Sequence, residues 1–150
     1  IIDAVDNFET KFLINDTCVL LKKPFCHAGI LQFQGQVMTY VPEEDQPCYR
    51  CIFEEIPESG SVPNCSQAGI IGAVAGIIGC IQALEAIKYL LGIGELLTGK
   101  MIVMDGLTMN TRVVKFPSKN KNCRVCGEHA DITSVKENRM EYVGAACPVK

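Results

Sequence analysis

The chain has 150 residues, of which 48% are hydrophobic and 21% charged, and its formal net charge is −3 with a sequence pI near 5.4. This length suits one domain with a sizeable core, and the composition excludes a disordered or low-complexity chain. The acidic balance argues against a nucleic-acid partner, because phosphate-binding surfaces are built from clustered Lys and Arg side chains.

Cysteine usage and hydropathy indicate a cytoplasmic protein. The nine cysteines are an odd number and follow no disulfide-framework spacing, which is typical of a reducing compartment. No secretory signal is expected, because Asp3, Asp6 and Glu9 interrupt any apolar stretch at the start. Residues 68–81 are all apolar or glycine, but a membrane-spanning helix needs about 18–20 such residues. We therefore expect a buried core helix there and no membrane partner.

The first elements are a strand end and a helix. Residues 1–5 are mostly apolar and are predicted to end a buried strand. Asp6 and Asn7 follow, and either can cap a helix that runs to about Leu21. Pro24 is expected to end that helix, because proline cannot continue the hydrogen-bond ladder.

Two strands and a long surface segment come next. Strands are predicted at residues 25–33 and 36–41, with a turn at Gly35. Residues 42–63 are acidic and contain several prolines, so they are predicted to form a long surface segment, and long loops in compact domains are commonly functional.

A long helix is predicted from Cys65 or Ser66 to about Leu91. Asn64 to Gln67 resembles a capping box, and Gly92 stands where a C-terminal cap glycine belongs. Four glycines recur inside this helix at three- and four-residue intervals, and each costs up to about 1 kcal/mol relative to alanine. We expect them to allow close approach of a neighbouring element, in the core or across a dimer interface, with the core favoured because the same face carries Ile70, Val74 and Ile77.

The last predicted strands are 101–104 and its antiparallel partner 112–116, and residues 128–150 are predicted to be a peripheral tail with at most one short helix. Two C-x-x-C pairs, Cys48–Cys51 and Cys123–Cys126, flank most of the chain. Such pairs supply the four sulfurs of a closed structural zinc site. Because loop-closure entropy grows slowly with length, one Zn²⁺ can clamp the end of the chain onto its middle.

Six motifs, taken in order, resemble the ThiF/MoeB/HesA adenylyltransferases, relatives of the ubiquitin-activating enzymes. They are Asp3–Asn7, Gly35–Val37, Pro47–Cys51, Asn64–Gly69, Gln82–Lys88 and Cys123–Cys126. The resemblance covers residues 1–127 and implies an α/β fold, the C-terminal half of a Rossmann-like activating enzyme, with a mixed sheet flanked by helices and a zinc site at one edge. It also implies a homodimer.

The resemblance implies ATP-dependent adenylation of the C-terminal glycine of a small ubiquitin-like sulfur-carrier protein, ThiS-like or MoaD-like. The product would serve sulfur transfer in thiamin or molybdopterin biosynthesis. The carrier's carboxylate would attack the α-phosphorus of ATP and give an acyl-adenylate and pyrophosphate. Catalysis of this kind depends on positioning and on charge neutralisation by Mg²⁺ and basic side chains.

The same resemblance assigns site residues. Asp6 matches the acidic residue beside the triphosphate and its Mg²⁺, and Asn7 adjoins the nucleotide. Cys48, Cys51, Cys123 and Cys126 match structural zinc ligands. Cys65 matches a cysteine that in some members becomes linked to the carrier's C-terminus, and the loop at 53–63 would cover the carrier's tail. Two alternatives stay open: Asp6 only caps the following helix, and Cys65 carries no chemistry.

Two departures from the family pattern matter. Lys11 stands where the family usually has arginine, and the two are not interchangeable in bidentate ion pairs. The glycine-rich turn and basic residues that hold ATP precede Asp6 in the family, and no G-x-G-x-x-G occurs here. We therefore expect these residues to lack the ATP-loop half and to be inactive alone. The competing hypothesis is a non-enzymatic zinc-stabilised module that binds a ubiquitin-like partner or a partner subunit.

Overall fold

A four-stranded antiparallel sheet forms the centre of the molecule in a computed structural model, which describes residues 1–42, 45–58, 61–62 and 68–143. The strand order is β1-β2-β3-β4, so each strand pairs with its neighbour in sequence. The strands are β1 (Phe25–Leu31), β2 (Gln34–Tyr40), β3 (Lys100–Asp105) and β4 (Asn110–Lys115). The predicted antiparallel pairing of the last two strands is confirmed.

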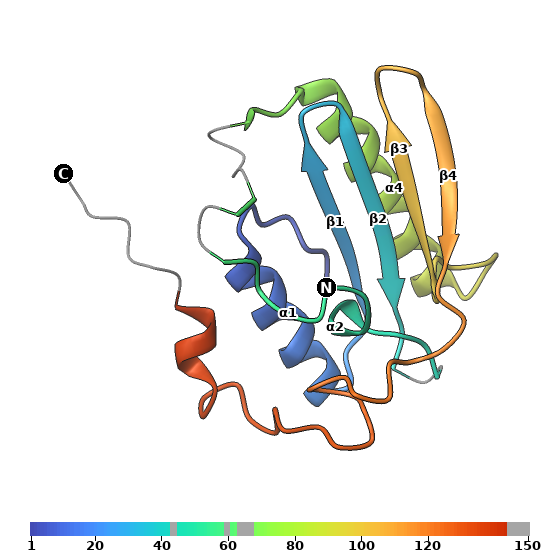
Figure 1. The fold of residues 1–150 in the computed structure, drawn as a ribbon. Helices are drawn as coiled ribbons and strands as arrows, with labels where there is room; N and C mark the ends of the chain where they lie inside the picture. The colour runs from blue at the N-terminus through green and yellow to red at the C-terminus, as the bar shows by residue number, and fades with distance from the viewer. Residues whose placement is uncertain (43–44, 59–60, 63–67, 144–150) are drawn as a thin grey trace.

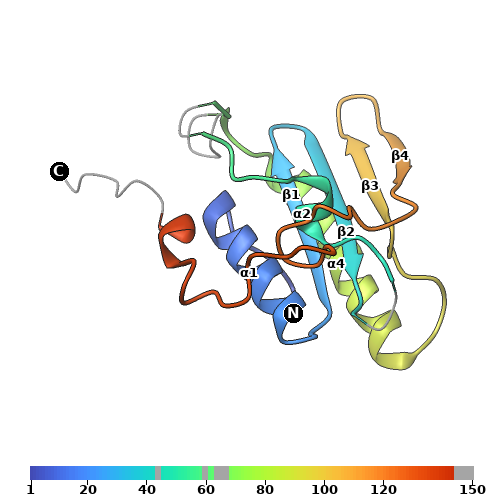
Figure 2. The ribbon, with the colours of Figure 1, turned by 60° about the horizontal axis from the view of Figure 1, so that its bottom comes forward.

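Helices lie on both faces of this sheet (Figures 1 and 2). One face of β1 and β2 carries α4 (Gly72–Leu91), and the other carries α1 (Phe8–Leu20) and the short α2 (Tyr49–Ile52). A 3₁₀ turn, η1 (Arg139–Tyr142), lies beside α1. Alternation along the strands divides the core into two clusters, because neighbouring residues of a strand point to opposite faces.

The N-terminal residues add a parallel pairing at the free edge of β1. Ile2 bridges Cys26 in the parallel sense, and the Asp3 N–H donates to the Cys26 carbonyl at 2.9 Å. The strand predicted at residues 1–5 is thus present only as this single bridge. The fold is α/β with helices on a sheet, as expected, but all four named strands are antiparallel.

The predicted helix cap and the predicted turn had different outcomes. Asn7 caps α1, since its Oδ1 accepts the Thr10 N–H at 2.8 Å, and α1 ends at Leu20 before Pro24. The turn predicted at Gly35 is wrong, because the chain reverses at Gln32 and Phe33 and Gly35 lies within β2. Glycine is needed there for close packing: a Cβ on Gly35 would lie 2.5 Å from Ile78 Cδ1 of α4.

The long helix ends where predicted but begins later. Gly92 closes α4 in the left-handed conformation at φ 63°, which confirms the predicted cap. The prediction of one continuous helix from Cys65 or Ser66 to Leu91 is wrong, since α4 begins at Gly72, and Cys65 and Ser66 themselves lie outside the described residues. Gly69 has φ 78° and Ile70 bridges Gln32, and both interrupt a helix at this point. Residues 64–67, the predicted capping box, lie outside the described residues.

The glycines of α4 do not face the core of this chain. Val74, Ile78, Gln82 and Glu85 face the sheet, whereas a Cβ on Gly72, Gly76 or Gly79 would meet no described atom within 4 Å. The interpretation that favoured the core is therefore wrong, and the expected buried core helix has only one buried face. By length and composition α4 can cross a membrane, with 22% of its apolar window buried.

Candidate metal centre and neighbouring polar cluster

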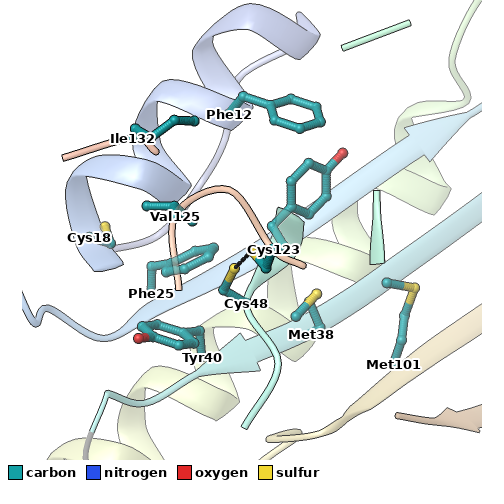
Figure 3. Close-up of a cluster of buried hydrophobic side chains, with 11 residues drawn as sticks. Phe12, Cys18, Phe25, Met38, Tyr40, Cys48, Met101, Cys123, Val125 and Ile132 are labelled. Atoms are coloured by element: carbon teal, nitrogen blue, oxygen red, sulfur yellow. Dashed lines mark hydrogen bonds between the residues drawn. The ribbon is translucent and has the colours of Figure 1, made fainter. Parts of the chain in front are cut away.

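The two C-x-x-C pairs meet at one point between α2 and the turns after β4. Cys48 precedes α2 and Cys51 lies within it, and the Cys51 N–H donates to the Cys48 carbonyl at 3.1 Å. In the second pair the Gly127 N–H donates to the Cys123 carbonyl at 2.8 Å. These tight turns aim both thiols of each pair toward the other pair. Figure 3 shows Cys48 and Cys123 facing each other within the core.

The sulfur positions fit a tetrahedral ion. The Cys48 Sγ lies 3.7 Å from Cys123 and 3.9 Å from Cys51, and the Cys126 Sγ lies 3.4 Å from Cys51 and 3.5 Å from Cys48. All four atoms lie within 4.8 Å of one another. A tetrahedron with Zn–S bonds of about 2.3 Å has S···S edges of about 3.8 Å. The prediction that the distant pairs meet is confirmed, and the cluster can hold a metal ion.

A buried ion pair fixes this centre against α1. Arg50, between the cysteines of the first pair, is 1% exposed, and its Nε and Nη2 donate to Asp16 of α1 at 2.8–3.0 Å. Burial would lower the pKa of Arg50, but the hydrogen bonds and charge of Asp16 outweigh it and raise that pKa. The guanidinium also lies 4.6 Å from the centroid of the Phe12 ring. The metal centre and α1 are therefore held in one arrangement.

The segment after the second pair contacts the same ion pair. The Tyr142 hydroxyl donates to Asp16 Oδ2 at 2.6 Å, and Glu141 pairs with Arg50 at 3.0 Å and with Arg124 at 2.9 Å. Ile132 is 1% exposed in the core cluster around Cys123. Sequence reasoning missed Asp16 and Arg50. Their signal was the presence of charged residues in the helix predicted up to about Leu21 and between two metal-ligand cysteines.

The predicted nucleotide residues lie at the start of α1. Asn7 is the N-cap, so the interpretation in which Asp6 caps the helix is wrong. The Asp6 side chain is exposed, and its one hydrogen bond among the described residues comes from Asn7 Nδ2 at 3.5 Å. Its carboxylate is thus accessible to a ligand. Cys65, the predicted nucleophile, lies outside the described residues.

A second buried polar cluster lies directly before Asp6. Asp3 is 2% exposed, and its Oδ2 lies 2.9 Å from Lys11 Nζ and 2.7 Å from His27 Nδ1. The ion pair that the lysine at position 11 put in doubt is therefore formed, through one carboxylate oxygen.

The fold and the four-cysteine cluster define a class of α/β domains in which a cluster that can hold a metal ion joins distant parts of one chain. Within that class, the profile of the ThiF family matches residues 1–125, and the chain belongs to the ThiF family.

Curated relatives agree with this assignment, and solved structures share the fold. The chain is 46% identical over 143 residues to the SAMP-activating enzyme E1 of Haloferax volcanii, covering 95% of this chain and 51% of that protein. It is 41% identical over 142 residues to the adenylyltransferase and sulfurtransferase MOCS3-1 of Zea mays, covering 95% of this chain and 30% of that protein. The E. coli MccB structure with succinimide superposes with a TM-score of 0.68 at 21% identity, covering 85% of this chain and 38% of that one. The chain thus spans between 30% and 51% of the length of these relatives.

Proposed function

We propose that this chain is the C-terminal half of an enzyme that adenylates the C-terminal glycine of a small ubiquitin-like sulfur carrier. The observation that carries the proposal is the 46% identity with the SAMP-activating enzyme E1 over 95% of this chain. The exposed carboxylate of Asp6 and the four-cysteine centre add support from the geometry. The chemistry would serve sulfur transfer in thiamin or molybdopterin biosynthesis, in the cytoplasm.

Adenylation converts a poor acyl donor into a good one. The carrier's carboxylate attacks the α-phosphorus of ATP, a P–O bond forms, and pyrophosphate leaves with the electron pair of the broken bond. Mg²⁺, when bound, neutralises phosphate charge, and it takes one or two carboxylates beside substrate phosphates. Asp6 fits this need with a hard, exposed oxygen donor, and Asn7 would lie against the nucleotide. Since these 150 residues contain no G-x-G-x-x-G, the phosphate-binding turn would come from outside them.

The other site residues have supporting roles. Cys48, Cys51, Cys123 and Cys126 would hold a structural Zn²⁺, since a closed four-sulfur site leaves no open position for substrate. Cys65 would attack the carrier's acyl-adenylate as a thiolate, so that a thioester with the carrier's C-terminus forms and AMP leaves with the electron pair of the broken C–O bond. Residues 1–127 would make up the adenylation part, and 128–150 a C-terminal extension.

We also propose that the intact enzyme is a homodimer that pairs through α4. The exposed face of α4 carries Ile77 (40% exposed), Leu84 (55%) and Ile87 (51%) beside its glycines, an unusual amount of apolar surface for a helix in water. A Leu84→Glu variant should shift the molar mass in light scattering from dimer to monomer, whereas Lys22→Glu, at an exposed site after α1, should not. A monomeric wild-type protein would contradict this.

The function is tested by ATP–pyrophosphate exchange with the full-length gene product and purified ThiS-like and MoaD-like carriers. We expect exchange that needs one carrier, at least a hundredfold loss in Asp6→Ala, and little change in the neighbouring Glu9→Gln. The 150-residue chain alone should show no exchange. Carrier binding by the full-length protein without any exchange would contradict the enzyme and support the zinc-stabilised binding module.

A further inference from the structure

Asp3 makes hydrogen bonds to α1, β1 and α4 and to the turn that follows it. Its Oδ2 accepts from Lys11 Nζ of α1 at 2.9 Å and from His27 Nδ1 of β1 at 2.7 Å. Its Oδ1 accepts the Val5 N–H at 3.1 Å, which closes a turn two residues ahead. One buried carboxylate therefore binds the helix, the strand and the turn that leads to Asp6.

The backbone of Asp3 is held as firmly as its side chain. Its N–H donates to the Cys26 carbonyl at 2.9 Å, and its carbonyl accepts from Gln82 Nε2 of α4 at 2.8 Å. The same Gln82 nitrogen donates to the Cys26 carbonyl at 3.0 Å, and Gln82 is 6% exposed. The sheet edge and α4 thus fix where the turn begins.

The charges in this cluster follow from the contacts. Burial raises the pKa of Asp3, but the hydrogen bond from His27 and the charge of Lys11 outweigh it and lower that pKa. Burial also lowers the pKa of His27, against the opposing effect of Asp3. Near neutral pH the cluster is an anion, a cation and a neutral imidazole that donates its Nδ1–H to Asp3. His27 Nε2 has no hydrogen-bond partner in the part of the chain that the structure describes.

Both flanks of Asp6 are attached to Asp3. The chain before Asp6 is held through the Val5 N–H, and the helix after it through Lys11, whose Nζ also donates to the Ala28 carbonyl at 2.6 Å. Asp6 itself makes only the 3.5 Å contact with Asn7 among the described residues. Its carboxylate therefore depends on its neighbours for its place.

We propose that Asp3 is a positioning residue for Asp6, holding the turn and the start of α1 so that the Asp6 carboxylate is presented to the metal–nucleotide. This inference rests on the proposed function of Asp6. It adds a role for the buried cluster that neither the metal centre nor Asp6 explains. Misplacing a catalytic group by about 1 Å can cost about a hundredfold in rate.

The test uses Asp3→Asn in the full-length enzyme, with Asp16→Asn as a matched control. Both substitutions neutralise a buried carboxylate paired with a cation, but Asp16 lies at the far end of α1 from Asp6. We expect Asp3→Asn to reduce exchange about tenfold to a hundredfold and to raise the Mg²⁺ concentration for half-maximal rate. In Asp16→Asn the Mg²⁺ dependence should stay as in the wild type.

A readout independent of activity is hydrogen exchange of the backbone amides at residues 4–8. It should become faster in Asp3→Asn by clearly more than in Asp16→Asn, where only the lower overall stability acts on these amides. If Asp3→Asn does not fold, Lys11→Met releases the helix side alone and should show the same two effects. Lys11→Arg keeps the charge and should leave both readouts near their wild-type values.

The outcomes separate this inference from the function it rests on. An Asp6→Ala enzyme as active as the wild type would overturn both. An inactive Asp6→Ala enzyme beside an Asp3→Asn enzyme with wild-type Mg²⁺ dependence would overturn the positioning role alone. Equal shifts in Asp3→Asn and Asp16→Asn would also overturn it, because they would show a general loss of structure.

Discussion

Removing the metal from the four-cysteine centre should cost a large part of the stability of this domain. The two pairs are 75 residues apart in sequence, whether counted from Cys48 to Cys123 or from Cys51 to Cys126. The chain-entropy relation for a cross-link of that length gives about 4.5 kcal/mol at 25 °C. Domains of this kind have a total unfolding free energy of about 5–15 kcal/mol. Loss of the clamp should therefore remove about a third or more of the unfolding free energy.

The measurement is urea unfolding followed by circular dichroism, with zinc content determined in parallel by mass spectrometry. The purified protein should hold about one Zn²⁺ per chain, as four thiolates require for a closed site. A chelator, or the double change Cys123→Ser and Cys126→Ser, should lower the unfolding free energy by about 4.5 kcal/mol. Cys80→Ser, which removes an exposed thiol on α4, is the control and should change it little.

Two results would refute this reasoning. The first is a folded wild-type protein with far less than one zinc per chain. The second is a urea midpoint that does not respond to chelation. Either would show that packing between α2, β4 and the following turns holds the pairs together without a metal.

Three further changes test the packing. Asp16→Asn should cost about 3–5 kcal/mol of unfolding free energy, because it leaves a buried guanidinium without its partner. Asp131→Asn, at an exposed ion pair that solvent screens, should change the unfolding free energy little. Gly35→Ala should cost about 1–3 kcal/mol, because its Cβ would meet α4. Gly79→Ala should raise the unfolding free energy of the monomer in urea by up to about 1 kcal/mol, because its Cβ would meet no described atom. Because the pKa of His27 is lowered in the folded state, the unfolded state takes up a proton below about pH 6.5 while the folded state does not. The unfolding free energy should therefore fall as the pH drops from about 6.5 toward 5. His27→Gln should flatten that slope in urea midpoints measured across this pH range.

Local signals gave the ends of several elements correctly. Asn7 caps α1 and Gly92 ends α4 in the left-handed conformation, because caps depend on a few adjacent residues. The same local reasoning failed at Gly35. A glycine there looks like a turn in sequence, but it lies inside β2 because α4 packs against that point.

The residues of the candidate site were likewise predicted only in part from the sequence. The spacing of Cys48, Cys51, Cys123 and Cys126 predicted a shared ion, and the structure brings their sulfurs together. Nothing in the spacing indicated that Arg50 and Asp16 would form a buried pair beside them. That pair joins residues 34 positions apart, so only the packing of α1 on α2 creates it.

The sequence by itself determined the family, the four cysteines that cluster, the first cap of α1 and the last cap of α4, because these depend on residue types at short spacing. The tertiary structure alone decided which face of α4 is covered, which carboxylates are buried and how Asp3 holds the flanks of Asp6. Burial and ion pairing depend on what lies opposite each side chain, and that partner comes from a distant part of the chain.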